Sequence, residues 1–135
     1  MTPRKSAENK RPLSPLGALQ ARIMERLWAR GPQALAELHR SLAEESEIAY
    51  TTIATELTRL QRKGLVLKHG VHLATRYQAA IERETFVERL VGGVLQGLLG
   101  THGRAAIHGF VDVIADDRDA LEETLRLLQE RRLSP

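Results

Sequence analysis

The stretch AYTTIATELTRLQRKGLV, from Ala49 to Val66, decides the fold of this 135-residue chain. Three apolar residues in it recur at spacings of four and three: Ile53, Leu57 and Leu60. This spacing predicts a helix over about 49–63 that buries one narrow stripe. Gly64 is well placed to end the helix, because glycine readily adopts the left-handed conformation found there. The remaining positions are rich in threonine, a mediocre helix former, which indicates a role beyond structure.

Two more helices are predicted before this stretch. Ser14-Pro15 has the pattern of a helix start, with a serine N-cap and a proline in the first turn. Gly31-Pro32 ends that first helix. A shorter second helix is indicated by Leu35, Leu38 and Leu42. Residues 1–13 are polar, basic and proline-containing, so we expect a disordered arm there.

After Gly64 the pattern changes to short, roughly alternating runs. LVL, KHG and VHLATRYQA predict two strands joined by a turn at Gly70, which form a wing over about 65–78. Three helices followed by a β-hairpin is the order of a winged helix-turn-helix domain. The predicted fold is therefore mostly α with a small β-hairpin wing, and residues 14–80 form the winged-helix domain.

Residues 81–135 are expected to be helical, and Asp116-Asp117 is typical of the N-cap of a last helix. Their apolar faces are broad for such short helices. They either fold back on the first domain or pair with a second copy of the chain. We expect pairing, because a DNA-binding protein gains from two-fold symmetry. The predicted dimerisation residues are Phe86, Leu90, Val94, Leu98, Phe110, Leu121, Leu125 and Leu128.

Charge is unevenly distributed along the chain, whose net charge is +3. Residues 81–135 hold seven cations against ten acids, so the basic excess lies in the first 80 residues. No acid occurs from Leu57 to Ile81, a segment that contains Arg59, Arg62, Lys63, Lys68 and Arg76. Such a run forms either a solvated face or a surface that binds a polyanion.

Composition excludes several classes of protein. The 42% hydrophobic content is ordinary for a globular protein, and no apolar run is long enough to span a bilayer. The basic N-terminus is followed by no apolar segment of a secretory signal. The chain has no cysteine, which removes disulfides and thiolate metal sites and fits a cytoplasmic protein.

Catalytic and metal-binding patterns are also missing from the sequence. There is no G-x-S-x-G, P-loop, H-E-x-x-H or paired-carboxylate arrangement, so we expect neither an enzyme nor a cofactor. Imidazoles at His69 and His72, or at His102 and His108, suit transition metals. Each pair supplies only half a site, however, so no metal site is predicted, and the alternative is that these histidines are surface or interface residues.

Three segments together resemble the penicillinase-repressor family, of the BlaI/MecI/CopY type. They are LGALQARIMERLWARGP (Leu16–Pro32), AYTTIATELTRLQRKGLV (Ala49–Val66) and ATRYQA (Ala74–Ala79). The resemblance covers roughly residues 14–80 in order and spacing, and the layout after Glu84 is similar to the dimerisation helices of the family.

The resemblance implies a homodimeric repressor that binds double-stranded DNA at an inverted-repeat operator. The helix over about 49–63 would be the recognition helix in the major groove, and the wing would lie on the backbone. The implied DNA-binding residues are Tyr50, Thr51, Thr52, Thr55, Thr58, Arg59, Arg62, Lys63, Lys68 and Arg76. The last four are expected at phosphates. Other roles remain open, since Thr51 or Thr52 can cap the helix, and Arg59 can pair with Glu56 or lie on the surface without a DNA contact.

The chain departs from the family in two places. Lactam-responsive members are cut at an Asn-Phe bond on a signal from a membrane sensor-protease, whereas here glycine precedes phenylalanine at Gly109-Phe110. That difference puts regulated cleavage and a sensor-protease partner in doubt. Copper-responsive members bind metal through Cys-x-Cys motifs, which a chain without cysteine does not have. The alternative function is a nonspecific architectural DNA-binding protein that uses the same basic surface.

Overall fold

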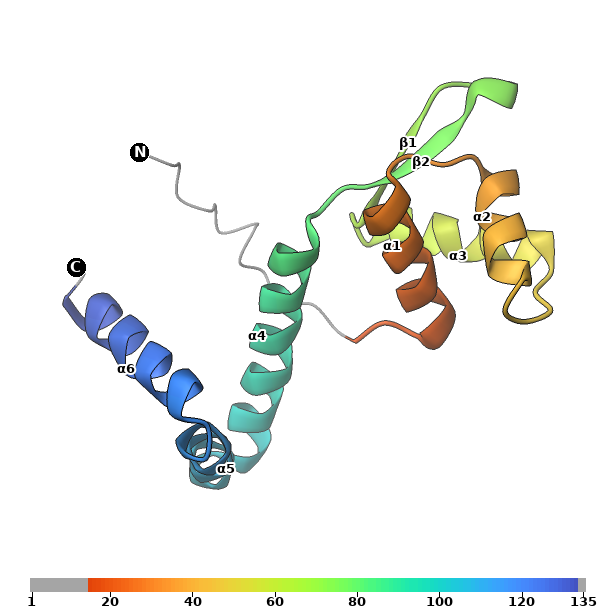
Figure 1. The fold of residues 1–135 in the computed structure, drawn as a ribbon. Coiled ribbons are helices and arrows are strands. Elements are labelled where there is room, and N and C mark those ends of the chain that lie inside the picture. The colour runs from red at the N-terminus through yellow and green to blue at the C-terminus, as the bar shows by residue number, and fades with distance from the viewer. Residues whose placement is uncertain (1–14, 134–135) are drawn as a thin grey trace. The chain divides into compact units, whose positions relative to one another are not determined.

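The computed structural model describes residues 15–133. Its elements follow the predicted order, mostly α-helical with one two-stranded antiparallel hairpin, so the predicted fold class is confirmed (Figure 1). The elements are α1 (Ala18–Arg30), α2 (Leu35–Ala43), α3 (Tyr50–Arg62), β1 (Val66–His69), β2 (Arg76–Ala79), α4 (Arg83–His102), α5 (Arg104–Ala115) and α6 (Arg118–Leu133). The basic arm over 1–13 and the Ser14 cap lie outside the described residues.

The chain divides into two units, and the first continues to Val91. Its core is built from aliphatic side chains of α1, α2, α3 and β1, together with one aromatic residue of α4. The buried members are Ile23, Met24, Leu27, Leu38, Leu42, Ile53, Leu57, Leu60, Leu65, Val66 and Phe86. The unit therefore extends beyond residue 80, the predicted end of the domain, because the first turns of α4 complete this core.

The start of α1 differs from the prediction. The helix begins at Ala18, with Gly17 at the N-cap, so Pro15 precedes the helix instead of occupying its first turn. The end of α1 is as predicted, since Gly31 has φ +79° and its N–H donates to the Leu27 carbonyl at 2.9 Å. Residues after Gly31 then pair with the wing, through reciprocal backbone hydrogen bonds of 2.9 and 2.7 Å between Gln33 and Tyr77.

A glycine closes α3 and sets the direction of the wing. Gly64 has φ +78° and donates to the Gln61 carbonyl at 2.9 Å, while the N–H of Leu65 donates to the Leu60 carbonyl at 3.0 Å. These two bonds form a Schellman motif, which satisfies the last carbonyls of the helix. Leu65 then enters the core, and β1 begins at the next residue, so the wing is fixed to the end of α3.

The wing is an antiparallel pair of four-residue strands, in the register Val66↔Ala79 to His69↔Arg76. The connection between the strands is longer than the turn predicted at Gly70. It includes a 3-10 turn over His72–Ala74.

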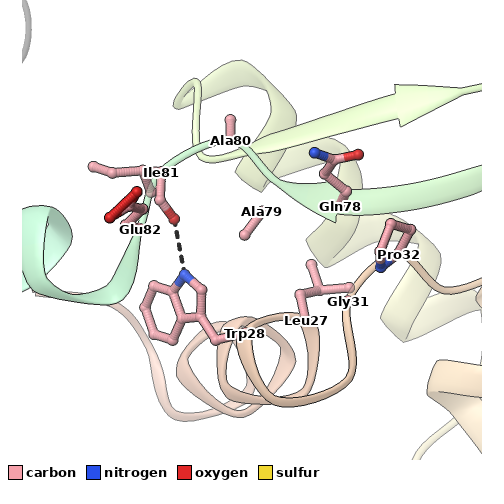
Figure 2. A pocket seen from close by; sticks show the side chains of 9 residues that line it. All are labelled: Leu27, Trp28, Gly31, Pro32, Gln78, Ala79, Ala80, Ile81 and Glu82. Carbon is pink, nitrogen blue, oxygen red and sulfur yellow. Dashed lines mark hydrogen bonds between the residues drawn. The ribbon is translucent and has the colours of Figure 1, made fainter.

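The first turn of α4 is anchored to α1 through Trp28. The indole N–H donates to the Ile81 carbonyl at 2.8 Å, as Figure 2 shows, and the Trp28 ring lies 5.5 Å from the Phe86 ring, centroid to centroid. Arg83 adds its guanidinium over the Trp28 ring at 5.3 Å and an ion pair with Glu25 at 2.5 Å. Trp28 also lines a mostly apolar hollow of about 260 Å³ between the end of α1 and residues 78–82.

The second unit comprises the rest of α4, α5 and α6. Asp117 caps α6, since its carboxylate accepts the Ala120 N–H at 3.0 Å, as the sequence predicted. Within residues 92–133 no side chain is fully buried. This unit, taken by itself, therefore has no core comparable to that of the first.

Between Pro15 and Leu133, no helix has the length and apolar character needed to cross a membrane.

Replacing Trp28 by Phe tests the anchor of α4. The ring contact with Phe86 is largely kept, but the hydrogen bond to Ile81 is lost and its carbonyl is left without that partner. We expect the free energy of unfolding to fall by about 1–2 kcal/mol. Urea titration followed by far-UV circular dichroism measures it, because the substitution removes the single tryptophan and with it the fluorescence signal. An unchanged unfolding midpoint would contradict the anchoring role.

Candidate nucleic-acid interface

The two sides of α3 are chemically opposite. Ile53, Leu57 and Leu60 are buried, and the predicted contact residues of the helix lie on the remaining surface. All ten predicted residues are exposed in the structure: Tyr50, Thr51, Thr52, Thr55, Thr58, Arg59, Arg62, Lys63, Lys68 and Arg76. The first eight lie on α3 or directly after it, and the last two lie on the wing that follows (Figure 1). Folding thus leaves the side chains of all ten residues accessible to a ligand.

The threonines of α3 do not cap the helix. Its N-cap is Ala49, without a side-chain hydrogen bond, so the capping alternative for Thr51 and Thr52 is wrong. The hydroxyls of Thr55 and Thr58 instead donate to the carbonyls four residues earlier, at 3.0 and 3.1 Å. Their oxygen lone pairs remain available as acceptors on the exposed face.

Arg59 is held by a hydrogen-bonded network that reaches into the core. Its guanidinium pairs with Glu56 at 2.7 Å, as one of the two sequence alternatives stated. The other carboxylate oxygen of Glu56 accepts a hydrogen bond from the side-chain N–H of Gln20 on α1, at 2.8 Å. The side-chain oxygen of Gln20 in turn accepts a hydrogen bond from the Lys63 ammonium, at 2.9 Å. Gln20 is only 8% exposed. A buried amide therefore orients a carboxylate and an ammonium, and the carboxylate orients Arg59.

Sequence reasoning offered the pair of Arg59 with Glu56 as an alternative but did not identify the bonds to Gln20. Gln20 lies 36 residues from Glu56 and carries no charge, so nothing in its neighbourhood marks it. Glu56 offered one signal, since it is the last acid before the acid-free segment. Arg40 on α2 is a further exposed cation that the prediction did not include.

The wing cations are also engaged. Arg76 pairs with Glu37 of α2 at 2.6 Å, and the Lys68 ammonium lies 6.0 Å from the centre of the Tyr77 ring. A hollow of about 280 Å³ lies beside the start of α2, and Lys68, Leu73 and Tyr77 of the wing region are among the residues that line it. Arg62 is paired with no acid among residues 15–133. The predicted cations therefore differ in their intramolecular partners: Arg59 and Arg76 are ion-paired, whereas Arg62 has no ion pair among the described residues.

Two carboxylates tie α2 to its neighbours. The Ala34 backbone N–H, at 2.8 Å, is the main cause of a lowered pKa at Glu37, and the charge and hydrogen bond of Arg76 act in the same direction. Hydrogen bonds from Arg26 and Arg22 lower the pKa of Glu45. The helix-turn-helix is thereby braced at both ends of α2.

In the described part of the chain, no group of three or more His, Cys, Asp or Glu side chains is arranged so that it could hold a metal ion. His39 contacts the Ile48 carbonyl at 3.0 Å and the edge of the Tyr50 ring, which connects α2 to the start of α3. His69 and His72 are exposed on the wing.

The predicted dimerisation residues fall into two groups. Phe86 is 7% exposed because it packs against Trp28 in the core of the first unit, so its assignment to a dimer surface is corrected. Leu90 also packs on that core. The residues of the second unit that stay at least partly exposed are Val94, Leu98, Phe110, Leu121, Leu125 and Leu128. Gly109 and Phe110 lie within α5.

Comparison with known proteins gives one family. The model of the family described as "Penicillinase repressor" matches residues 16–129. The "Transcriptional regulator BlaI" of Mycobacterium tuberculosis, from strains CDC 1551 / Oshkosh and H37Rv, is 35% identical over 120 residues, which are 87% of this chain and 87% of the relative. A solved structure titled "The complex structure of hsRosR-S4" aligns with a TM-score of 0.46 and 23% identity, over 78% of this chain and 92% of that one.

Titration of Glu37 tests the brace at the start of α2. Its pKa is lowered from the ordinary 4.5, so its ionised form stabilises the fold above that pH, and the contribution is lost as the pH falls through the lowered value. We expect the carboxyl ¹³C resonance of Glu37 to titrate with a midpoint below 4.5. In Glu37→Gln, stability should be lower than wild type at pH 7, and the difference should shrink in acid. A midpoint at or above the ordinary value would contradict the observed geometry.

Proposed function

Because the chain belongs to the penicillinase repressor family, we propose that it is a homodimeric, sequence-specific repressor that binds a palindromic operator. Membership of the family places it among transcriptional regulators with a winged-helix DNA-binding fold, and not among enzymes. The observation that supports the finer proposal is the exposure of the threonines and cations of α3 together with the cations of the wing, in a chain segment that has no acid from Leu57 to Ile81.

In the proposed complex, α3 lies in the major groove. Its small threonine side chains let the helix approach the bases closely, and their methyl groups can contact thymine methyls. The hydroxyl hydrogens of Thr55 and Thr58 already bond to the helix backbone. These oxygens are therefore suited to accept from the amino groups of adenine or cytosine, which are major-groove donors.

Arg59 is the proposed base-reading cation, and the others contact phosphate. The fixed orientation that Glu56 and Gln20 impose supports this division, since base recognition needs a defined side-chain direction. Lys63 bonds to Gln20 through one of its three N–H groups, which leaves two for a phosphate. Arg62, Lys68 and Arg76 would neutralise further phosphates beside it.

Residues 92–133 are the proposed dimerisation unit. Their exposed apolar side chains and the lack of a buried one within this unit support pairing with a second copy, because such surface is otherwise left in water. In a symmetric dimer, the two α3 helices would enter major grooves about 34 Å apart or a multiple of that distance. Repression would then follow from occlusion of the polymerase.

The experiment that tests the proposal is a gel shift of the full chain on its own upstream promoter DNA, with excess unrelated duplex as competitor. We expect a discrete complex that survives the competitor and a footprint with a dyad. Sedimentation equilibrium should give twice the chain mass of 15.1 kDa. A complex that the competitor abolishes, on this promoter and on a genome-derived fragment library, would favour the nonspecific architectural alternative, whose affinity depends steeply on salt alone.

A double-mutant cycle tests how Glu56 acts on Arg59. Arg59→Ala should lower operator affinity by about 1–3 kcal/mol and affect random DNA much less. Glu56→Gln removes the acid but keeps the bond to Gln20 possible, so it should raise affinity for random DNA and lower the operator-to-random ratio. In the Arg59→Ala background, Glu56→Gln should leave that ratio unchanged. An equal loss on both DNAs in Arg59→Ala would reduce Arg59 to a phosphate contact.

A further inference from the structure

The tip of the wing presents apolar side chains to solvent. Leu73 is 102% exposed, Val71 is 70% exposed and Leu67 on β1 is 47% exposed. One exposed leucine needs no explanation, but Val71 and Leu73 are both largely exposed at the tip, and neighbouring exposed apolar side chains can mark an interaction surface. None of the three belongs to the core of the first unit, whereas Val66 of β1 and the aliphatic residues of α3 are buried in it.

The backbone of the tip is a defined structure. Gly70 has φ +82°, and a Cβ atom there would lie 2.4 Å from the Ala74 carbonyl oxygen, so the loop is closed against itself. The N–H groups of Ala74 and Thr75 donate to the carbonyls of Val71 and His72 at 3.0 and 3.2 Å. His72 adopts φ +53°, which is uncommon for a residue with a side chain. The closed turn thus fixes the position of Leu73 at the tip of the wing, where its side chain is exposed at the rim of the hollow beside the start of α2.

The surroundings of the tip are cationic. Lys68 and Arg76 stand on the two strands below it, with Arg76 paired to Glu37 of α2, and the segment from Leu57 to Ile81 itself contains no acid. An apolar apex on a basic hairpin matches a partner that combines phosphates with an apolar slot. The stacked bases of duplex DNA, reached through the minor groove, are such a partner, and leucine is among the side chains that enter base steps there.

The position of the wing favours DNA over an anionic membrane. The hairpin starts directly from the closed end of α3, the helix proposed to lie in the major groove. Its four paired residues span about 14 Å at roughly 3.4 Å each, and the tip adds to this length. The neighbouring minor groove lies about half a helical turn away, roughly 17 Å. A membrane would gain only two apolar side chains and the two cations of the strands.

We propose that Leu73, with Val71 beside it, is an apolar wedge that enters the minor groove flanking each half-site and opens a base step. This inference rests on the proposed function. It adds a determinant of specificity that α3 does not supply, because steps such as TA and CA/TG unstack more easily than others. Operators would then be selected partly by the flexibility of bases outside the sequence that α3 contacts.

The test places 2-aminopurine, whose fluorescence rises on unstacking, at successive flanking steps of the footprinted operator and uses the full chain. Wild type should raise the fluorescence at one step per half-site and prefer a TA step there over a G·C flank by on the order of tenfold. Leu73→Ala should abolish both effects while leaving the salt dependence unchanged, since the phosphate contacts remain. Leu67→Ala, on the same hairpin but below the tip, is the matched control and should behave as wild type.

The possible failures are distinguishable. A protein that binds its operator but leaves every flanking base stacked, or a Leu73→Ala variant that keeps the signal, overturns the wedge and leaves the repressor proposal intact. Binding of wild type to phosphatidylglycerol vesicles that Leu73→Ala loses, with no change on DNA, reassigns the tip to a lipid surface. A protein that binds no duplex overturns the proposed function and the wedge together.

Discussion

The burial of one side of α3 is the constraint on which the rest of this structure depends. Three aliphatic side chains at helical spacing face the core, and they fix the rotation of the helix about its axis. The threonines and arginines of the helix then lie at the surface. The Schellman motif at Gly64 sets the direction in which the chain leaves α3. The next two residues, Leu65 and Val66, are buried in the same core, so the start of the wing is fixed relative to the helix. The relative placement of helix and hairpin is therefore determined by packing in the core, and not by the basic residues that they expose.

Local patterns in the sequence were sufficient to predict most of the fold. Gly31 and Gly64 ended their helices as expected, since the chemistry of a helix C-terminus depends on neighbouring residues alone. The helix start predicted at Pro15 was wrong, because proline is compatible with the first turn of a helix but does not require one. The helix begins later, at Ala18. Phe86 was misplaced for a different reason: an apolar residue near a domain boundary has the same periodicity whichever core it joins, and only the contact with Trp28 decides.

The membership of the candidate site stays a prediction, and its hydrogen-bonded connections were not predicted from the sequence. The type and spacing of residues identified an exposed basic segment, and exposure in the structure agrees with it. The bond from Gln20 to Glu56 joins residues of two helices, so no periodicity along the chain encodes it. The pairing of Arg76 with Glu37 is of the same kind. Consequently, binding of an anion through Arg59 or Arg76 would replace an existing ion pair with Glu56 or Glu37. Before the anion binds, those ion pairs already hold the two guanidinium groups in defined positions.

The second unit has a consequence for how the amount of protein controls its action. Because residues 92–133 bury no side chain within their own unit, the proposed pairing of two chains would supply the missing core, and assembly and folding of this unit would be one equilibrium. The concentration of the assembled form then rises with the square of the chain concentration while single chains predominate. A modest dilution, such as that caused by growth and division without new synthesis, would remove the binding-competent species more than proportionately. Gene expression controlled in this way responds to the abundance of its regulator as a threshold.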